Sequence, residues 1–215
     1  IWAVLALGAM GNAAPATASP RAWLVVDADS RTVLAEHNAA SLVRPASLTK
    51  MMTVFVTLHA MRRDNRRLNW NTSIRLSRRA ARQAPTRVGG QVGQQLSIRD
   101  ALVALMVQSA NDASVALAEH VAGSVERFVA LMNVTAHQLG MRHTRYVNPS
   151  GLPARGQHTN ALDTAILVNA LTRDFPGFQT ILAARELRWN GRTYRRGHML
   201  LGHQVPVLKL SLIHI

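Results

Sequence analysis

The 215-residue chain contains no cysteine, only two lysines, and few aromatic residues, which make up 5% of it. Without cysteine it can form neither disulfides nor a thiolate nucleophile, and the usual zinc patterns of Cys or Cys with His are excluded. The His-Glu-x-x-His pattern of zinc hydrolases and the Gly-x-Ser-x-Gly elbow of Ser-His-Asp hydrolases are also missing. We therefore interpret the histidines, His143 and His158 among them, as surface or core residues.

Acidic residues are also few, since 11 Asp and Glu stand against 25 Lys and Arg, giving a formal charge of +14. A basic surface can attract nucleic acid, anionic lipid or an anionic wall polymer. The arginines are scattered, however, in runs no longer than pairs such as Arg62-Arg63 and Arg78-Arg79. We interpret the charge as a generally basic, solvated surface, and we expect no nucleic-acid partner.

The length and apolar content, 48%, are enough for one buried core and too small for two full domains. The uncharged apolar run at 1–10 leads into small residues around 16–18, which is typical of the end of a secretory signal peptide. A buried N-terminal strand or helix is the alternative. We expect residues 1–18 to be a signal-peptide remnant and the exported, mature chain to start near Ser19.

Local patterns predict a mixture of helices and hairpins. Apolar strands around turn residues predict a hairpin over 22–35, and Asn190-Gly191 predicts a second one. The Arg-rich stretch at 62–93 predicts loop and short strand. Helices are predicted by apolar periodicity and by capping residues such as Ser97, Gly140 and Asn160. The predicted helices are 47–61, 101–107, a segment that follows Asn111, 126–139 and 160–172.

Ser47 and Lys50 are the first pair of residues with the chemistry of acyl transfer. A serine nucleophile needs a base within hydrogen-bond reach, and residues three apart on a helix share one face. The dipole at a helix start also favours negative charge on Ser47. The simple alternative is a helix cap followed by a solvated lysine. Because the chain uses arginine almost everywhere else, and arginine cannot lose its proton, the rare lysine favours the catalytic interpretation.

Ser109-Ala110-Asn111 lies between two predicted helices. Its hydroxyl could relay a proton, and its amide could hold a substrate carbonyl. Taken alone, the segment is more simply explained as a cap of the helix that follows.

Three longer motifs occur in order along the chain: Pro-Ala-Ser-Leu-Thr-Lys-Met at 45–51, Leu-Met-Val-Gln-Ser-Ala-Asn-Asp at 105–112 and Asn-Pro-Ser-Gly-Leu at 148–152. In sequence and approximate spacing they resemble the serine-type D-alanyl-D-alanine carboxypeptidases, the low-molecular-mass penicillin-binding proteins. The resemblance extends from about Ala22 to Lys209.

The resemblance implies a role for each of four residues. Ser47 would be the acylated nucleophile and Lys50 its general base. Ser109 would relay a proton, and Asn111 would position the substrate. No metal and no organic cofactor is needed for this chemistry.

The implied fold is α/β (α+β), a β-lactamase/transpeptidase-like domain with an antiparallel sheet flanked by helices and the nucleophile in the cleft between sub-domains. The implied substrate is a peptidoglycan stem peptide that ends in D-Ala-D-Ala, from which the enzyme releases the last D-alanine. β-Lactam antibiotics would be inhibitors. The implied location is the periplasm or the outer face of the cytoplasmic membrane, with membrane association through a C-terminal anchor.

The chain departs from the family in two places. The third motif, Lys-Thr-Gly, is broken: Lys209 stands at about the expected distance and would bind the substrate carboxylate, but Leu210-Ser211 follows it. The segment 210–215 resembles a translated sequencing adapter. We therefore expect a catalytic domain over 19–209 that is truncated within the third-motif strand, a non-native tail over 210–215, and no activity in the chain as given. The second departure is Arg196-Gly197-His198, where the family is usually Asn-rich.

Three other functions share part of this pattern. A D,D-endopeptidase of the same family would show every motif. A non-catalytic penicillin-binding sensor is compatible with a broken third motif. A class A β-lactamase shares the Ser-x-x-Lys helix but also needs a carboxylate to activate the deacylating water, usually in a Glu-x-x-x-Asn pattern. We consider it the weakest of the three.

Overall fold

The structure, a computed structural model, describes residues 22–27, 30, 32–196 and 210–214. The predicted signal peptide and Lys209 lie outside the described residues. The strands are β1 Trp23–Asp27, β2 Val33–His37, β3 Ser73–Arg75, β4 Gln95–Ser97, β5 Glu186–Trp189, β6 Arg192–Arg195 and β7 Leu210–His214. The helices are the 3₁₀ turn η1 Ala46–Leu48, then α1 Thr49–Arg63, α2 Arg78–Ala81, α3 Ile98–Val107, α4 Asn111–Ala122, α5 Val125–Leu139, α6 Ala161–Asp174 and α7 Phe178–Leu182.

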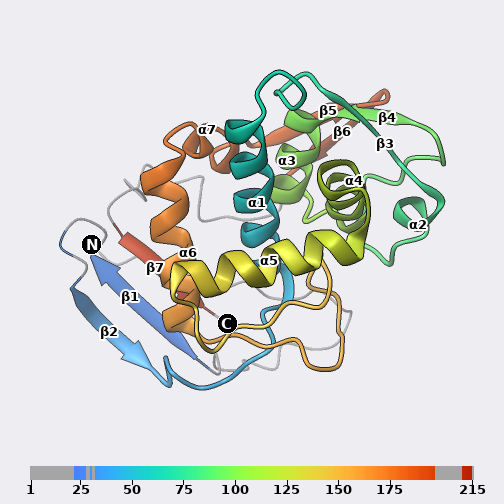
Figure 1. The fold of residues 1–215 in the computed structure, drawn as a ribbon. Coiled ribbons are helices and arrows are strands. Elements are labelled where there is room, and N and C mark those ends of the chain that lie inside the picture. The colour runs from blue at the N-terminus through green and yellow to red at the C-terminus, as the bar shows by residue number, and fades with distance from the viewer. Residues whose placement is uncertain (1–21, 28–29, 31, 197–209, 215) are drawn as a thin grey trace, which may run out of the picture.

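The described strands form three antiparallel sheets, ordered β2-β1-β7, β3-β4 and β5-β6. Figure 1 shows the three-stranded sheet at the lower left beside α6, with both two-stranded sheets at the upper right. Helix α1 lies between these two ends of the molecule. The expected α/β architecture, antiparallel sheet flanked by helices, is confirmed.

Strand β7 comes from the segment that was expected to be a non-native tail. It pairs with β1 along its whole length, from Trp23 opposite His214 to Asp27 opposite Leu210. Strand β1 therefore has a partner on each side.

The predicted local elements are mostly confirmed. Both hairpins form, and Asn190 and Gly191 take the positive φ angles, 50° and 70°, that a tight two-residue hairpin turn requires. Gly140 ends α5 in the left-handed conformation, with φ 86°. Asn160 caps α6 by accepting a hydrogen bond from the Asp163 N–H at 2.7 Å. The stretch at 62–93 contains β3, as expected, and also α2, which was not predicted.

The start of the first long helix differs from the prediction. Ser47 lies in the 3₁₀ turn η1, and the α-helix proper begins at Thr49. Ala46, the first residue of this turn, has a left-handed φ of 45°, which non-glycine residues seldom adopt.

Helix α1 runs through the centre of the core, so nearly every side of it is buried. Met52, Val54 and Phe55 are at most 4% exposed and belong to a cluster that includes side chains of α3, α4 and α5. Thr53 and Thr57 are buried on the same helix, and Thr57 satisfies its hydroxyl by donating to the Thr53 carbonyl at 2.8 Å. A helix that is buried on all sides holds its polar residues in fixed positions.

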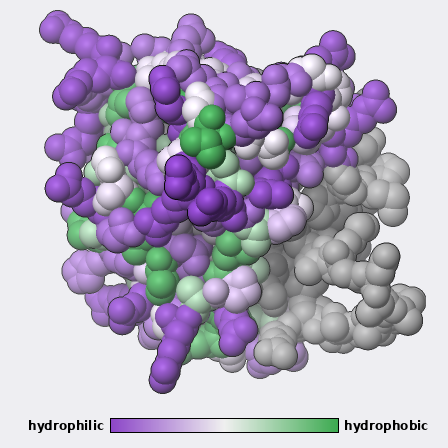
Figure 2. Space-filling view, turned by 90° about the vertical axis from the view of Figure 1, so that its right-hand side faces the viewer, coloured by the Kyte–Doolittle hydropathy of each residue, from purple (hydrophilic) through white to green (hydrophobic). Residues whose placement is uncertain are grey.

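The surface is largely polar. Hydrophilic side chains cover most of the described part of the face in Figure 2, with apolar side chains visible between them. Among the described residues, no helix has both the length and the apolar content needed to cross a membrane.

Helix α3 ends at the Ser109 segment, and the Ser97 side chain caps its start. The Ser97 hydroxyl oxygen accepts from the Asp100 N–H at 3.0 Å and donates to the Asp100 carboxylate at 2.8 Å. The first of these bonds satisfies a backbone N–H of the first helical turn, which has no partner within the helix.

Replacing Ser97 with alanine removes both bonds, so we expect the free energy of unfolding to fall by about 1 kcal/mol. The matched control is Ser41→Ala, because the Ser41 side chain is exposed and makes no hydrogen bond within the described part of the chain. Urea denaturation of both variants measures the difference. Equal loss of stability in the two would show that the cap does not stabilise α3.

Candidate active site

The two predicted reactive serines lie in contact. The Ser109 hydroxyl donates a hydrogen bond to the Ser47 hydroxyl oxygen at 2.9 Å, although 62 positions separate them in the sequence. Ser47 is exposed, and Ser109 is half-buried. Ser109 has a φ of 53°, a left-handed conformation that non-glycine residues seldom adopt and that often occurs at functional sites.

Lys50 lies behind this serine pair and is buried, with 2% of its surface exposed. Its Nζ donates to the Asn111 Oδ1 at 2.8 Å and to the Ser150 carbonyl at 2.5 Å. None of the ion pairs among the described residues involves Lys50. Burial without a carboxylate lowers the pKa of Lys50 from 10.5 to about 7.

This arrangement leaves the amine able to accept a proton. A neutral lysine amine has two N–H donors and one lone pair, and both acceptors are already in place for the two donors. The lone pair is therefore available. In the described residues the Ser47 hydroxyl is bonded to Ser109 and not to Lys50, so a direct transfer from Ser47 requires the hydroxyl to rotate.

Asn111 fixes the position of the Lys50 amine. Its Nδ2 donates to the carbonyls of Ala84 and Pro85 at 2.9 and 3.2 Å, which leaves Oδ1 facing Lys50. The orientation of the amide is thus set by three partners. Because both of its N–H groups are bonded to the protein, the substrate-positioning role of Asn111 stays a prediction.

The simple capping interpretation of Ser109-Ala110-Asn111 is wrong. The N-cap of α4 is Ala110, and no side chain caps that helix. The polar side chains of the segment contact Ser47 and Lys50 instead.

The segment Asn148–Leu152 belongs to the site, although sequence reasoning gave it no role. The Pro149 carbonyl accepts from the buried Thr53 hydroxyl at 2.6 Å, directly beside the Ser150 carbonyl that holds Lys50. The Asn148 side chain holds the turn by accepting from the Gly151 N–H at 2.7 Å. The available signal was Asn-Pro-Ser-Gly, which predicts a turn but not the direction of its carbonyls.

Gly151 packs against the backbone of the nucleophile turn. Its φ is 85°, and a Cβ placed on it would lie 1.8 Å from the Ala46 carbonyl oxygen and 3.1 Å from the Ser47 nitrogen. The close approach therefore requires glycine at this position.

A second loop is held against the site by a buried carboxylate. Asp112 accepts from the N–H groups of Val88 and Gly89 at 3.0 and 2.9 Å. The Thr86 hydroxyl of the same loop donates to the Ser109 carbonyl at 2.8 Å. The loop that binds the Asn111 amide is thus itself fixed at several points.

A Glu-x-x-x-Asn spacing does occur in the chain, from Glu186 to Asn190, but it lies in the hairpin of β5 and β6. The Glu186 carboxylate accepts from Arg188 at 2.8 Å. No hydrogen bond among the described residues joins it to Ser47, Lys50 or Ser109, so it does not serve the site as a deacylating base would.

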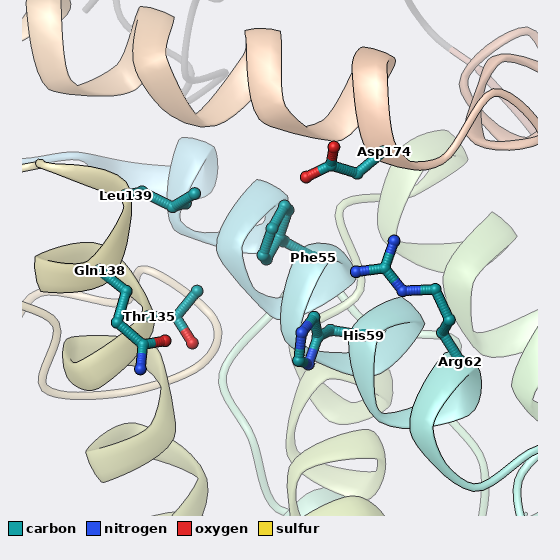
Figure 3. A pocket seen from close by; sticks show the side chains of 7 residues that line it. All are labelled: Phe55, His59, Arg62, Thr135, Gln138, Leu139 and Asp174. Carbon is teal, nitrogen blue, oxygen red and sulfur yellow. The ribbon is translucent and has the colours of Figure 1, made fainter.

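A pocket of about 160 Å³ lies towards the other end of α1, against α5 and the end of α6 (Figure 3). Burial, followed by the charges of Arg62 and Arg63, lowers the pKa of His59 there, and Arg173 binds both oxygens of Asp174. No described hydrogen bond joins the Thr135 hydroxyl to His59. The pocket is lined by Phe55, His59, Arg62, Thr135, Gln138, Leu139 and Asp174.

Potential metal ligands do not gather among the described residues: no group of three or more His, Asp or Glu side chains could hold an ion there.

Comparison of the sequence with known proteins identifies a family and several relatives. The profile of the Peptidase_S11 family, D-alanyl-D-alanine carboxypeptidase, matches residues 9–209. The D-alanyl-D-alanine carboxypeptidase DacD of Salmonella typhimurium is 36% identical over 186 residues, which is 84% of this chain and 47% of DacD. A D-alanyl-D-alanine endopeptidase of Pseudomonas aeruginosa is 36% identical over 154 residues, or 71% of this chain and 47% of the endopeptidase. The chain spans about half the length of these curated relatives.

The fold is also that of solved penicillin-binding proteins. Penicillin binding protein 5 from Haemophilus influenzae superposes with a TM-score of 0.80 at 29% identity. The match covers 89% of this chain and 56% of that protein. The transpeptidase-like fold expected from the motifs is therefore confirmed.

Replacing Gly151 with alanine should disturb the Ser47 turn and slow acylation by a β-lactam by roughly 10- to 100-fold, because a displacement of about 1 Å at a reacting group has effects of that size. Gly156→Ala is the matched control, since Gly156 has the same φ of 85° but open space around its Cβ position. Stopped-flow acylation of the two variants of the full-length protein separates close packing from backbone strain. Equal rates would contradict the packing account.

Proposed function

The chain belongs to the D-alanyl-D-alanine carboxypeptidase family, and on that premise we propose that the protein is a penicillin-binding serine D,D-carboxypeptidase that removes the terminal D-alanine from peptidoglycan stem peptides. The observation that carries the proposal is the buried, carboxylate-free Lys50, one helical turn from a serine hydroxyl that is bonded to Ser109. The names of the relatives, among them a penicillin binding protein, support the substrate and the inhibitor class.

In the proposed acylation step, the Ser47 oxygen attacks the penultimate carbonyl carbon of the stem peptide. The Ser47 proton passes to the lone pair of Lys50, since burial lowers the pKa of this amine to about 7 and a substantial fraction of it is neutral at that pH. The Ser109 hydroxyl, which already donates to Ser47, stabilises the developing negative charge and relays a proton from Lys50 to the departing D-alanine nitrogen. The C–N bond breaks, and an ester to Ser47 remains.

In the proposed deacylation step, water attacks the Ser47 ester and gives up a proton to the same Lys50 and Ser109 pair. The pair passes that proton to the Ser47 oxygen as its bond to the acyl carbon breaks, which regenerates the Ser47 hydroxyl and releases the shortened peptide. This chain's residues need no metal or organic cofactor for either step. A substrate-carboxylate contact by Lys209 remains part of the proposal.

A D,D-endopeptidase is the second candidate, because the Pseudomonas aeruginosa endopeptidase is as similar as the DacD relative, at 36% identity. Both reactions would use the same nucleophile and base. A pentapeptide and a crosslinked stem-peptide dimer, offered separately to the full-length protein, distinguish them by the product released.

We also propose that the protein acts outside the cytoplasm, in the periplasm or on the outer face of the membrane, where its substrate is located. The apolar run at 1–10 and the small residues that follow support export. A C-terminal anchor, as is common in the family, would add membrane association.

Labelled penicillin should acylate Ser47 in the full-length protein, because this hydroxyl is exposed at the site and bonded to Ser109. Peptide mapping by mass spectrometry identifies the modified residue. Ser47→Ala should abolish the label, and Ser41→Ala, at an exposed serine away from these contacts, should retain it. A label on another serine, or no label when a known penicillin-binding protein is labelled in parallel, would refute the assignment.

The rate of acylation should depend on the protonation of Lys50. The neutral amine is the active form and its pKa is about 7, so the rate should fall as the pH decreases below about 7 and level off above it. Lys50→Arg keeps the charge but cannot act as a base, and we expect a loss of about 10² to 10⁴ in rate. Lys50→Met, similar in length but without an amine, controls for side-chain size. Near-normal acylation by either folded variant would exclude the base role.

A further inference from the structure

Arg196 joins the C-terminal ends of two helices. Its Nε and Nη2 donate to the Met106 carbonyl in the last turn of α3, at 3.1 and 2.8 Å. Its Nη1 donates to the Leu182 carbonyl at the end of α7, at 2.5 Å. The side chain is partly buried, and 90 positions separate Arg196 from Met106.

These contacts fit the chemistry of helix ends. The last carbonyls of a helix have no partner within the helix and carry partial negative charge, and a guanidinium satisfies several of them with its rigid fork of donors. Arg196 takes part in none of the ion pairs among the described residues. In the described part of the chain, backbone carbonyls at two helix ends therefore hold the guanidinium.

Arg196 directly follows the hairpin of β5 and β6, which hydrogen bonds hold in place. The Arg196 N–H donates to the Arg185 carbonyl at 2.9 Å, which extends the pairing of β5 and β6 by one step. The Trp189 indole donates to the Gln95 carbonyl at 3.1 Å, and the Tyr194 hydroxyl donates to the Val88 carbonyl at 2.5 Å. Arg196 thus reaches Met106 from a fixed direction.

The Met106 carbonyl lies within the turn that sets the position of Ser109. The N–H groups of Gln108 and Ala110 both donate to the Ala104 carbonyl, at 3.0 and 3.2 Å, so that 104–110 forms one closed unit. Ser109 sits in this unit with its left-handed φ of 53° and points its hydroxyl at Ser47. A shift of the last turn of α3 therefore moves the Ser109 hydroxyl.

We propose that Arg196 is a positioning residue for Ser109, holding the end of α3 so that the hydroxyl meets Ser47; this rests on the proposed function. The guanidinium holds this turn at the Met106 carbonyl, and the Thr86 hydroxyl holds it at the Ser109 carbonyl, to which it donates at 2.8 Å.

The first test does not depend on activity. Hydrogen exchange is measured on Arg196→Gln and on the control Arg195→Gln, which changes the neighbouring exposed arginine on the same strand. The proposal predicts faster exchange of the Gln108 and Ala110 amides in the first variant only, with α1 and α5 unchanged. Unchanged protection of those two amides would overturn the proposal, whether or not the protein proves to be a carboxypeptidase.

The second test is a double-mutant cycle in the full-length protein, read as the acylation rate per titrated active site well below the melting temperature. We expect Arg196→Gln to slow acylation roughly 10- to 100-fold, and Arg196→Lys to restore part of the rate. Combined with Ser109→Ala, Arg196→Gln should have little further effect, because both changes act on one hydroxyl.

Multiplicative losses in the double variant would contradict action through Ser109, as would a loss of melting temperature without a change in the rate per active site. A wild-type protein that is not acylated at Ser47 would refute the proposed function, and the exchange measurement would then still decide the role of Arg196.

Discussion

The burial of the Lys50 amine without a carboxylate is the constraint on which the rest of the site depends. Lowering its pKa from 10.5 to about 7 corresponds to roughly 5 kcal/mol against the protonated form in the folded state. Between these two values the folded protein binds fewer protons than the unfolded chain. The contribution of Lys50 to stability therefore becomes more favourable as the pH rises through this range, and its cost is fully present below about 7. The same burial that destabilises the protonated amine allows it to take up a proton near neutral pH.

The surrounding structure keeps the amine in place with neutral acceptors. Asn111 presents its carbonyl oxygen because its two N–H groups are held by the loop at 84–85, and Asp112 fixes that loop in turn. The second acceptor of Lys50 is the Ser150 carbonyl. It belongs to the turn that contains Gly151, and Gly151 packs against the Ala46 backbone directly before Ser47. An ionised carboxylate in either place would raise the pKa of the lysine and remove the free lone pair at neutral pH. The neutral amide and backbone acceptors therefore allow the pKa of Lys50 to stay low.

Sequence reasoning predicted the longer helices α1, α3, α4, α5 and α6 and both hairpins, because these depend on side-chain pattern and capping residues, but it did not predict α2 or α7. Recognisable motifs singled out Ser47 and Ser109, and the structure shows that their hydroxyls are hydrogen-bonded. Asn160 and Gly140 bound their helices as predicted, for example. The sequence could not show that Ser150 and Met106 matter through their carbonyl oxygens, because every residue has a carbonyl and only the fold gives it a direction. It also suggested a helix cap at Ser109, since the geometry that turns this hydroxyl towards Ser47 depends on a left-handed backbone.

Direct titration of Lys50 is the measurement that tests this account most closely. With lysine labelled at its terminal carbon, the chemical shift of each amine can be followed by NMR across pH 5 to 12, and the Lys50 signal is assigned by its loss in Lys50→Met. The account predicts that this signal titrates near pH 7, far below the usual lysine value of 10.5. A Lys50 signal that titrates at about 10.5 would show that the amine is protonated at neutral pH and would contradict the central claim.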